Sequence, residues 1–201
     1  MYKKIPNQTI ASILVRYELS DDAKPLLLDK MTPIEAIATL NEAKLFNDTV
    51  QFISHALPMV DAINWASIVM ELRENEWDDT QIHAINSARN WLKQPNETHR
   101  VRANQLADRV GLESAPSWVA KAVFWSGTGS IVAPELPAVM PPAFLYGHAV
   151  SAAITVAAAV PQWQEGEMGY EQFYIKAIQL GIDIANGQSA KTALLKIKEE
   201  S

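Results

Sequence analysis

The chain has 201 residues, which fits one large domain better than two small ones and is long enough to bury a core without metals or disulfides. Its net charge of −6 argues against a general affinity for nucleic acid, which needs clustered lysine and arginine. It has no cysteine, which excludes a disulfide framework, a thiol nucleophile and a zinc site with sulfur ligands.

The first residues do not match the pattern of a secretory signal. Lys3 and Lys4 precede only a short apolar run, residues 10–15, which Arg16 interrupts. A signal peptide has a longer apolar core and a cleavage site of small residues. We therefore expect a cytoplasmic protein.

The N-terminal half contains several helix-start signals. Thr32, Pro33 and Glu35 form the pattern of a capped helix start, with proline at the first helical position. Asn47 is expected to cap a helix over 48–57, and Pro58 to open the next one, to about residue 73.

The helix expected at 58–73 is apolar nearly all round, which is typical of a buried helix. Its polar residues, Asp61, Asn64, Ser67 and Glu71, fall on one narrow stripe.

Further helices are expected at 79–93, 96–110, 116–125, about 142–160, about 170–185 and 190–197, with Gly111 and Asn186-Gly187 as stops. Four prolines make residues 127–142 an extended loop rather than a strand. Strand-like alternation is absent from the sequence. It therefore predicts one all-α domain over 1–201, with about ten helices and one long proline-rich loop.

The stretch between Glu135 and Glu165 carries no charged residue. Its helical part approaches the length of a membrane span, but it is diluted by polar residues and has no flanking Lys or Arg, so we expect a core helix instead.

Large aromatic residues are expected to mark the core and the surface. Helix faces that point inward carry Trp65, Trp91, Trp118 and Trp125, which we expect to be structural core. Trp77 and Trp163 lie near loops and are better candidates for surface contacts.

The titratable residues give no recognisable catalytic or metal site, so we expect no metal and no cofactor. His55, with Asp48 and Gln51, and His83 are expected on solvent-exposed faces, and His148 as a buried neutral imidazole in the apolar helix. A basic patch that includes Arg100 and Arg102 is expected to be a solvated helix face.

The loop 127–142 has two possible roles. Its apolar residues Ile131, Val132, Leu136 and Val139, with Trp163, could bind a partner protein, because a segment preset toward extended conformations loses little entropy on binding. Alternatively, the loop lies across its own domain and covers the region of Trp125.

Three stretches resemble a known family: FISHALPMVDAINWA at 52–66, AVFWSGTGSIVAPELPAVMPPAFLYGHAVSAAI at 122–154, and LGIDIANG at 180–187. Together they resemble a family of uncharacterised helical proteobacterial proteins that tends to be encoded beside type VI secretion adaptors and effectors. The resemblance brings no catalytic residues. It implies an adaptor, co-chaperone or regulator of effector loading, with a secretion adaptor or effector as protein partner.

The leading hypothesis is therefore a non-catalytic interaction protein without a nucleic-acid partner or a membrane span. Two alternatives stay open: an enzyme that uses His148 with Asp61, Asn64 and Glu71, and a purely structural subunit.

Overall fold

The helices surround a central apolar helix, the one that the uncharged stretch of the sequence supplies. The computed structural model describes residues 1–160 and 168–199, and these contain helices and loops but no strand. The helices are α1 (Ala11–Leu14), α2 (Pro33–Glu42), α3 (Phe46–Ala56), α4 (Met59–Val69), the 3₁₀ helix η1 (Met70–Glu76), α5 (Asp79–Lys93), α6 (Glu97–Val110), α7 (Ala115–Phe124), α8 (Leu145–Ala158), α9 (Tyr170–Ala185) and α10 (Ala190–Glu199). The expected all-α class and helix number are confirmed.

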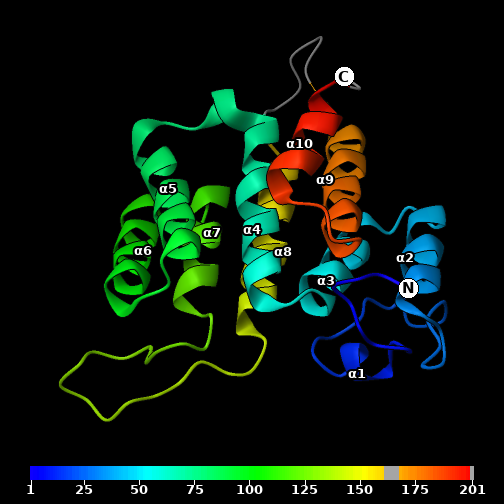
Figure 1. Cartoon of the computed structure of the whole chain (residues 1–201), viewed down its shortest axis with the longest axis horizontal. Coiled ribbons are helices and arrows are strands. Elements are labelled where there is room, and N and C mark those ends of the chain that lie inside the picture. Colours follow the sequence, from blue (N-terminus) through cyan, green and yellow to red (C-terminus); the bar gives the residue numbers. More distant parts are fainter. Residues whose placement is uncertain (161–167, 200–201) are drawn as a thin grey trace.

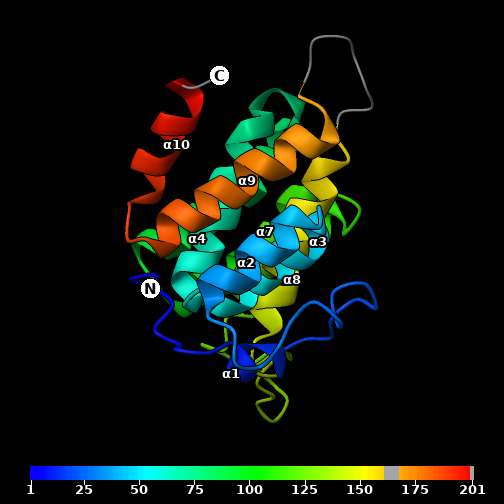
Figure 2. The ribbon, with the colours of Figure 1, turned by 90° about the vertical axis from the view of Figure 1, so that its right-hand side faces the viewer.

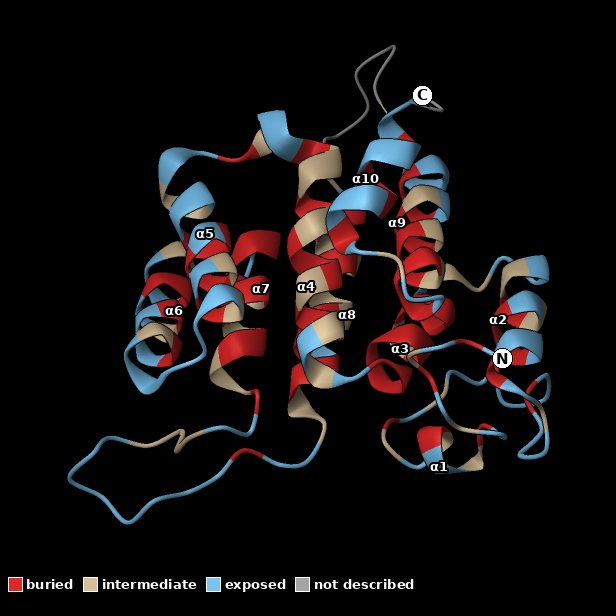
Figure 3. Ribbon diagram, in the orientation of Figure 1, coloured by how far each residue is buried: buried red, intermediate tan, exposed pale blue. Residues whose placement is uncertain are grey.

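The central helix is α8, which packs against α7, α3, α4 and α9. On one side α5, α6 and α7 form a three-helix group, and on the other lie α2, α3, α9 and α10 (Figure 1). Buried residues make up the largest share of α3 and α7, which both pack against α8 (Figure 3). None of the helices in the described residues combines the length and the apolar character needed to cross a bilayer.

Several helix ends follow the expected local chemistry. Thr32 and Glu35 form the reciprocal capping box at the start of α2, and the side chain of Asn96 accepts a hydrogen bond from the backbone N–H of His99 at the start of α6. Gly111 and Gly187, with φ of 88° and 95°, follow the ends of α6 and α9, where the left-handed half of φ space favours glycine.

Three expected boundaries are wrong. Helix α3 begins at Phe46, one residue before the expected cap Asn47. Asn47 lies inside the helix, and its side chain accepts a hydrogen bond from the Tyr174 hydroxyl. The third expected helix is α-helical only to Val69 and continues as 3₁₀ helix, with Arg73 outside helical geometry at φ −128°.

The start of the central helix is the third difference. Helix α8 begins at Leu145 rather than at Pro142, after Phe144 in the left-handed conformation at φ 62°. A bulky residue rarely adopts that conformation. Here the Phe144 ring is held under the guanidinium of Arg16, 4.3 Å from the ring centroid. The turn before the helix thus places the Phe144 ring against the N-terminal segment.

The N-terminal segment has little helix and packs along one end of the bundle (Figure 2). The Lys4 N–H donates to the Ala185 carbonyl at 2.9 Å, and the Lys4 ammonium pairs with Asp61 at 2.6 Å. Further along, the Ile10 N–H donates to the Met31 carbonyl at 2.9 Å. This segment therefore ties α4 and α9 to the first part of the chain.

Candidate functional site

The proline-rich segment 127–142, here called the arm, projects beyond the helices that it joins. It leaves the end of α7, extends away from the bundle and returns to the start of α8 (Figures 1 and 2). Residues 133–140 are all exposed. The alternative that this part of the arm covers the core near Trp125 is therefore wrong.

The residues predicted to bind a partner divide along the arm. Leu136 and Val139 are 59% and 48% exposed, whereas Ile131 and Val132, nearer the bundle, are half-buried. Met140, which the sequence reasoning missed, is 52% exposed. It belongs to the same proline-flanked stretch, which was the available signal. Trp163 lies outside the described residues.

The two sides of the arm are joined at its base by Ser130 and Ile131. The Ile131 N–H donates to the Val139 carbonyl at 2.8 Å. The Ser130 hydroxyl oxygen accepts from the N–H groups of Val132 and Val139 at 3.2 and 3.1 Å. Toward the tip, the Leu136 N–H closes a turn onto the Ala133 carbonyl at 3.0 Å, with Pro134 at the turn position that suits its fixed φ.

Arg100 of α6 fastens this base to the bundle. Its side chain is only 1% exposed, and it donates to the Ser130 carbonyl at 2.6 Å and to the Phe124 carbonyl at 2.9 Å. It also binds both carboxylate oxygens of Glu97, at 2.6 and 2.7 Å. A buried guanidinium needs such partners, because its fork of donors would otherwise lose hydration without replacement.

The expectation that Arg100 belongs to a solvated face is wrong. Arg100 falls on the same side of α6 as Ala103 and Ala107, which are fully buried, and this three-to-four-residue spacing was the signal for burial. Arg102, in contrast, is exposed as expected.

Two further features show how tightly this junction is built. A Cβ on Gly129 would lie 2.6 Å from Arg100 Nε and from Glu97 Oε2, so a larger residue cannot be accommodated without moving the ion pair. The hydrogen bonds from Arg100 hold the pKa of the Glu97 carboxyl below its usual range. Gly129, Arg100 and Glu97 thus fix the direction in which the arm starts.

For two of the four histidines the burial is opposite to that expected. His55 is fully buried and His148 is exposed, whereas His83 is exposed as expected. The polar side of α3 is covered by the N-terminal segment, which was not foreseen. Tyr17 stacks on the His55 ring with centroids 4.8 Å apart, and Arg16 donates to the His55 carbonyl at 2.6 Å.

Burial lowers the pKa of His55 from 6.5 to about 4; the hydrogen bond to the Gln51 carbonyl opposes this shift, and the neighbouring His148 and Arg16 side chains add to it. The His55 Nδ1 lies 2.9 Å from the Gln51 carbonyl, which in the neutral ring makes Nδ1 the donor. Within the described part of the chain, neither His55 Nε2 nor the Tyr17 hydroxyl has a hydrogen-bond partner. The ring is therefore a packed, neutral element of the α3–α8 contact.

The groups considered for catalysis are spread over three environments. His148 contacts the edge of the His55 ring, with centroids 4.6 Å apart. Asp61 pairs with Lys4, whereas Asn64 and Glu71, further along the same stripe, line a groove. Among residues 1–160 and 168–199, no group of three His, Cys, Asp or Glu side chains is placed to hold a metal ion.

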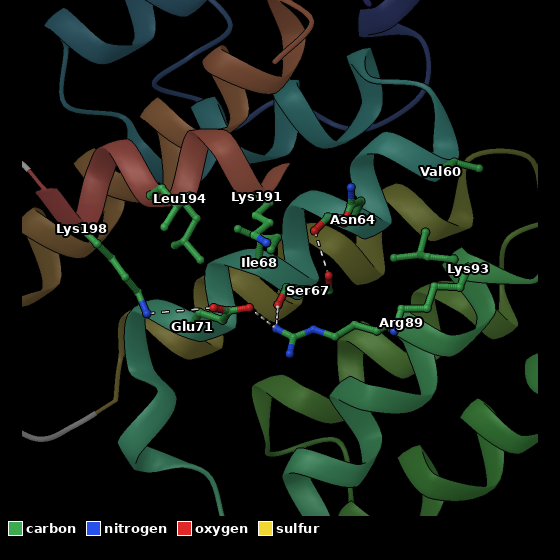
Figure 4. Close-up of a pocket in the computed structure, with 12 residues that line it drawn as sticks. Val60, Asn64, Ser67, Ile68, Glu71, Arg89, Lys93, Lys191, Leu194 and Lys198 are labelled. Atoms are coloured by element: carbon green, nitrogen blue, oxygen red, sulfur yellow. Dashed lines mark hydrogen bonds and ion pairs between the residues drawn. The ribbon is translucent and has the colours of Figure 1, made fainter. Parts of the chain in front are cut away.

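That groove has a volume of about 570 Å³ and lies between α4, α5 and α10 (Figure 4). Arg89 of α5 reaches across it to the Ser67 carbonyl at 3.0 Å and to Glu71 at 2.8 Å. Lys198 of α10 lies 4.0 Å from the same carboxylate. Glu71 therefore links the two walls of the groove at one end.

The tryptophans differ in how far they are buried. Trp65 and Trp91 are fully buried, and Trp65 Nε1 donates to the Ala177 carbonyl at 2.8 Å. Trp118 and Trp125 are half-buried and meet edge to face near the base of the arm. Trp77, expected near the surface, is buried, with its indole N–H bonded to the Met70 carbonyl at 2.9 Å.

A family model matches most of the chain. The model of a family of unknown function (DUF6931) matches residues 36–185, which include α3 to α9 and the arm. No curated protein and no solved structure matches the chain.

Proposed function

The chain belongs to the DUF6931 family of unknown function, and we propose that it is a non-catalytic interaction module whose arm, residues 127–142, inserts into a partner protein. The observation that carries this proposal is the exposure of Leu136, Val139 and Met140 on a segment that projects from the bundle. Exposed large apolar residues gathered on one extended element are typical of binding surfaces rather than of ordinary protein surface.

The construction of the arm favours binding by insertion. Prolines at 134, 137, 141 and 142 restrict the backbone before binding, so less conformational entropy is lost when a partner orders it. The contacts of Arg100 and Ser130 hold the base while the tip stays free. An arm fixed at its base presents its apolar side chains in a limited range of directions.

The proposed partner is a type VI secretion adaptor or effector, and the proposed role is that of a cytoplasmic adaptor, co-chaperone or regulator of effector loading. The support for this partner is the resemblance of residues 52–66, 122–154 and 180–187 to proteins encoded beside such genes. The exposed apolar tip supports a protein partner in general.

The test is co-expression of the tagged chain with the adaptor and the effector encoded nearest to it, followed by gel filtration and measurement of Kd. We expect a stable complex with one of them. The double variant Leu136→Ser, Val139→Ser should weaken it at least about tenfold, because central apolar anchors each contribute on the order of 1–2 kcal/mol.

A matched control changes two equally exposed apolar residues elsewhere. Leu28 and Ile34 are 54% and 43% exposed and lie outside the arm, so Leu28→Ser, Ile34→Ser should leave Kd unchanged. Equal weakening by both double variants, or no complex with either neighbour, would contradict the proposal. A symmetric oligomer that forms without a partner would instead favour a structural subunit.

A further inference from the structure

The groove between α4, α5 and α10 leaves one side of α4 uncovered, although the rest of that helix is largely buried. Its floor is the stripe of α4 on which Val60, Asn64 and Ile68 are spaced four residues apart, and Glu71 continues the line into η1. These residues are half-buried or exposed, while the rest of α4 is largely enclosed. Of the narrow polar stripe found in the sequence, Asn64, Ser67 and Glu71 line this groove, whereas Asp61 pairs with Lys4 instead.

The centre of the groove is apolar. Val60 and Ile68 on the floor, Leu92 on α5, and Leu194 and Leu195 on α10 present aliphatic side chains toward it (Figure 4 shows Val60, Ile68 and Leu194). At 1.5 Å per residue the floor from Val60 to Ile68 is about 12 Å long, with a further turn to Glu71. This length suits about three turns of a helix laid along it.

The rim of the groove is cationic although the chain as a whole has a net charge of −6. Arg89 and Lys93 stand on the α5 wall, Lys191 and Lys198 on the α10 wall, and Glu71 is the only acidic residue of the lining. Glu71 is already paired with Arg89, and Lys198 also lies 3.4 Å from Glu74. In the described part of the chain Lys93 and Lys191 form no ion pair.

We propose that this groove binds an amphipathic helix of another protein, with leucine-like residues spaced three and four apart against Val60, Ile68 and Leu92, and with acidic residues facing Lys93 and Lys191. Charge complementarity selects this occupant: the open cations flank an apolar strip, so a helix with carboxylates on either side of an apolar stripe matches both. No residue of the arm lines the groove, and the inference does not depend on the proposed function of the arm.

The probe is a fluorescein-labelled synthetic helix of about four turns, with leucines at three- and four-residue spacing and glutamates on both sides of the leucine stripe. Its binding is followed by fluorescence anisotropy at low and high salt. We expect saturable binding that weakens as salt rises, because exposed charges are screened. A peptide of the same composition in scrambled order should bind at least about tenfold more weakly.

The protein variant that tests the site is Lys93→Glu, Lys191→Glu, which changes two exposed side chains and should leave the circular dichroism spectrum unchanged. We expect this variant to weaken binding of the peptide at least about tenfold, since the attraction between lysine and glutamate becomes repulsion at two positions. The control Lys30→Glu reverses an exposed lysine far along the chain from the groove and should not alter binding. The arm variant Leu136→Ser, Val139→Ser should also bind the peptide normally.

Three outcomes would overturn the inference. The first is unchanged affinity in Lys93→Glu, Lys191→Glu, and the second is equal binding of the scrambled peptide. The third is binding only to vesicles of equal parts phosphatidylcholine and phosphatidylglycerol, with none to the peptide, which would assign the cations to an anionic membrane surface.

Discussion

Gly147 of α8 lies directly against the imidazole of His55. A Cβ at position 147 would lie 2.8 Å from both Cδ2 and Nε2 of that ring. The ring cannot easily move aside, because it is stacked on Tyr17 and its Nδ1 is bonded to the Gln51 carbonyl. Helices α3 and α8 therefore approach each other here at a distance that only glycine permits.

We expect Gly147→Ala to lower the free energy of unfolding by up to about 2 kcal/mol, since overpacking costs roughly 1–3 kcal/mol and the gain in helix propensity offsets about 1. Urea denaturation measures the change. In a His55→Ala background the same substitution should cost little or even stabilise, because the ring is gone. An equal cost in both backgrounds would show that the clash with His55 is not the cause.

Stability should fall on acidification because His55 is held neutral. The unfolded chain binds a proton at this residue below about pH 6.5, whereas the folded chain does so only near pH 4. Between these values the unfolded state carries more protons, so the contribution of His55 to stability is complete above pH 6.5 and decreases toward pH 4, by up to about 3 kcal/mol.

The measurement is the midpoint of urea denaturation between pH 4 and 7. His55→Phe should reduce the dependence on pH in that window, while His83→Gln, which removes an exposed histidine, should not. A slope that is the same in His55→Phe as in the parent chain would contradict this origin.

The base of the arm should loosen when Arg100 loses its fork of donors. Arg100→Lys keeps the charge but cannot reach Glu97, Ser130 and Phe124 together, so we expect a loss of about 1–3 kcal/mol in stability. Hydrogen exchange at the amides of Ile131 and Val139 should become faster. Arg102→Lys, two residues away and exposed, is the control and should change neither quantity.

Two tryptophans allow burial and hydrogen bonding to be separated. The indoles of Trp65 and Trp118 both donate to backbone carbonyls, at 2.8 and 2.7 Å, but only Trp65 is fully buried. We expect Trp65→Phe to lower the free energy of unfolding, measured by urea denaturation, by about 2 kcal/mol, and Trp118→Phe to lower it by clearly less. Equal losses would mean that the hydrogen bond, rather than the buried volume, dominates.

The helices that carry strong local signals were predictable from the sequence. Capping at Thr32 and Asn96 and the glycine stops at 111 and 187 act within a few residues, so they can be read without knowing the tertiary structure. The arm was predictable for the same reason, because its prolines exclude both helix and strand ladders.

Errors arose where one segment covers another. The polar side of α3 looked exposed, but Ser20 binds Asp48 through its N–H and its hydroxyl, at 3.2 and 3.0 Å, and Tyr17 covers His55. A polar face that is buried by polar contacts from a distant, non-helical segment gives no periodic signal. The exposure of His148 was missed although Ser151 and Thr155, three and seven residues further on, lie on the same less buried side of α8 and were the available signal.

The route of the chain at the arm separates sequence changes in the tip from changes in the helical framework. Helices α7 and α8 pack against each other, and Arg100 and Ser130 fasten the point where the chain leaves them. Insertions, deletions or replacements between residues 133 and 140 then leave the helical framework and its fastening untouched. Under the proposed function, a tip transplanted between two such scaffolds should carry its binding preference with it.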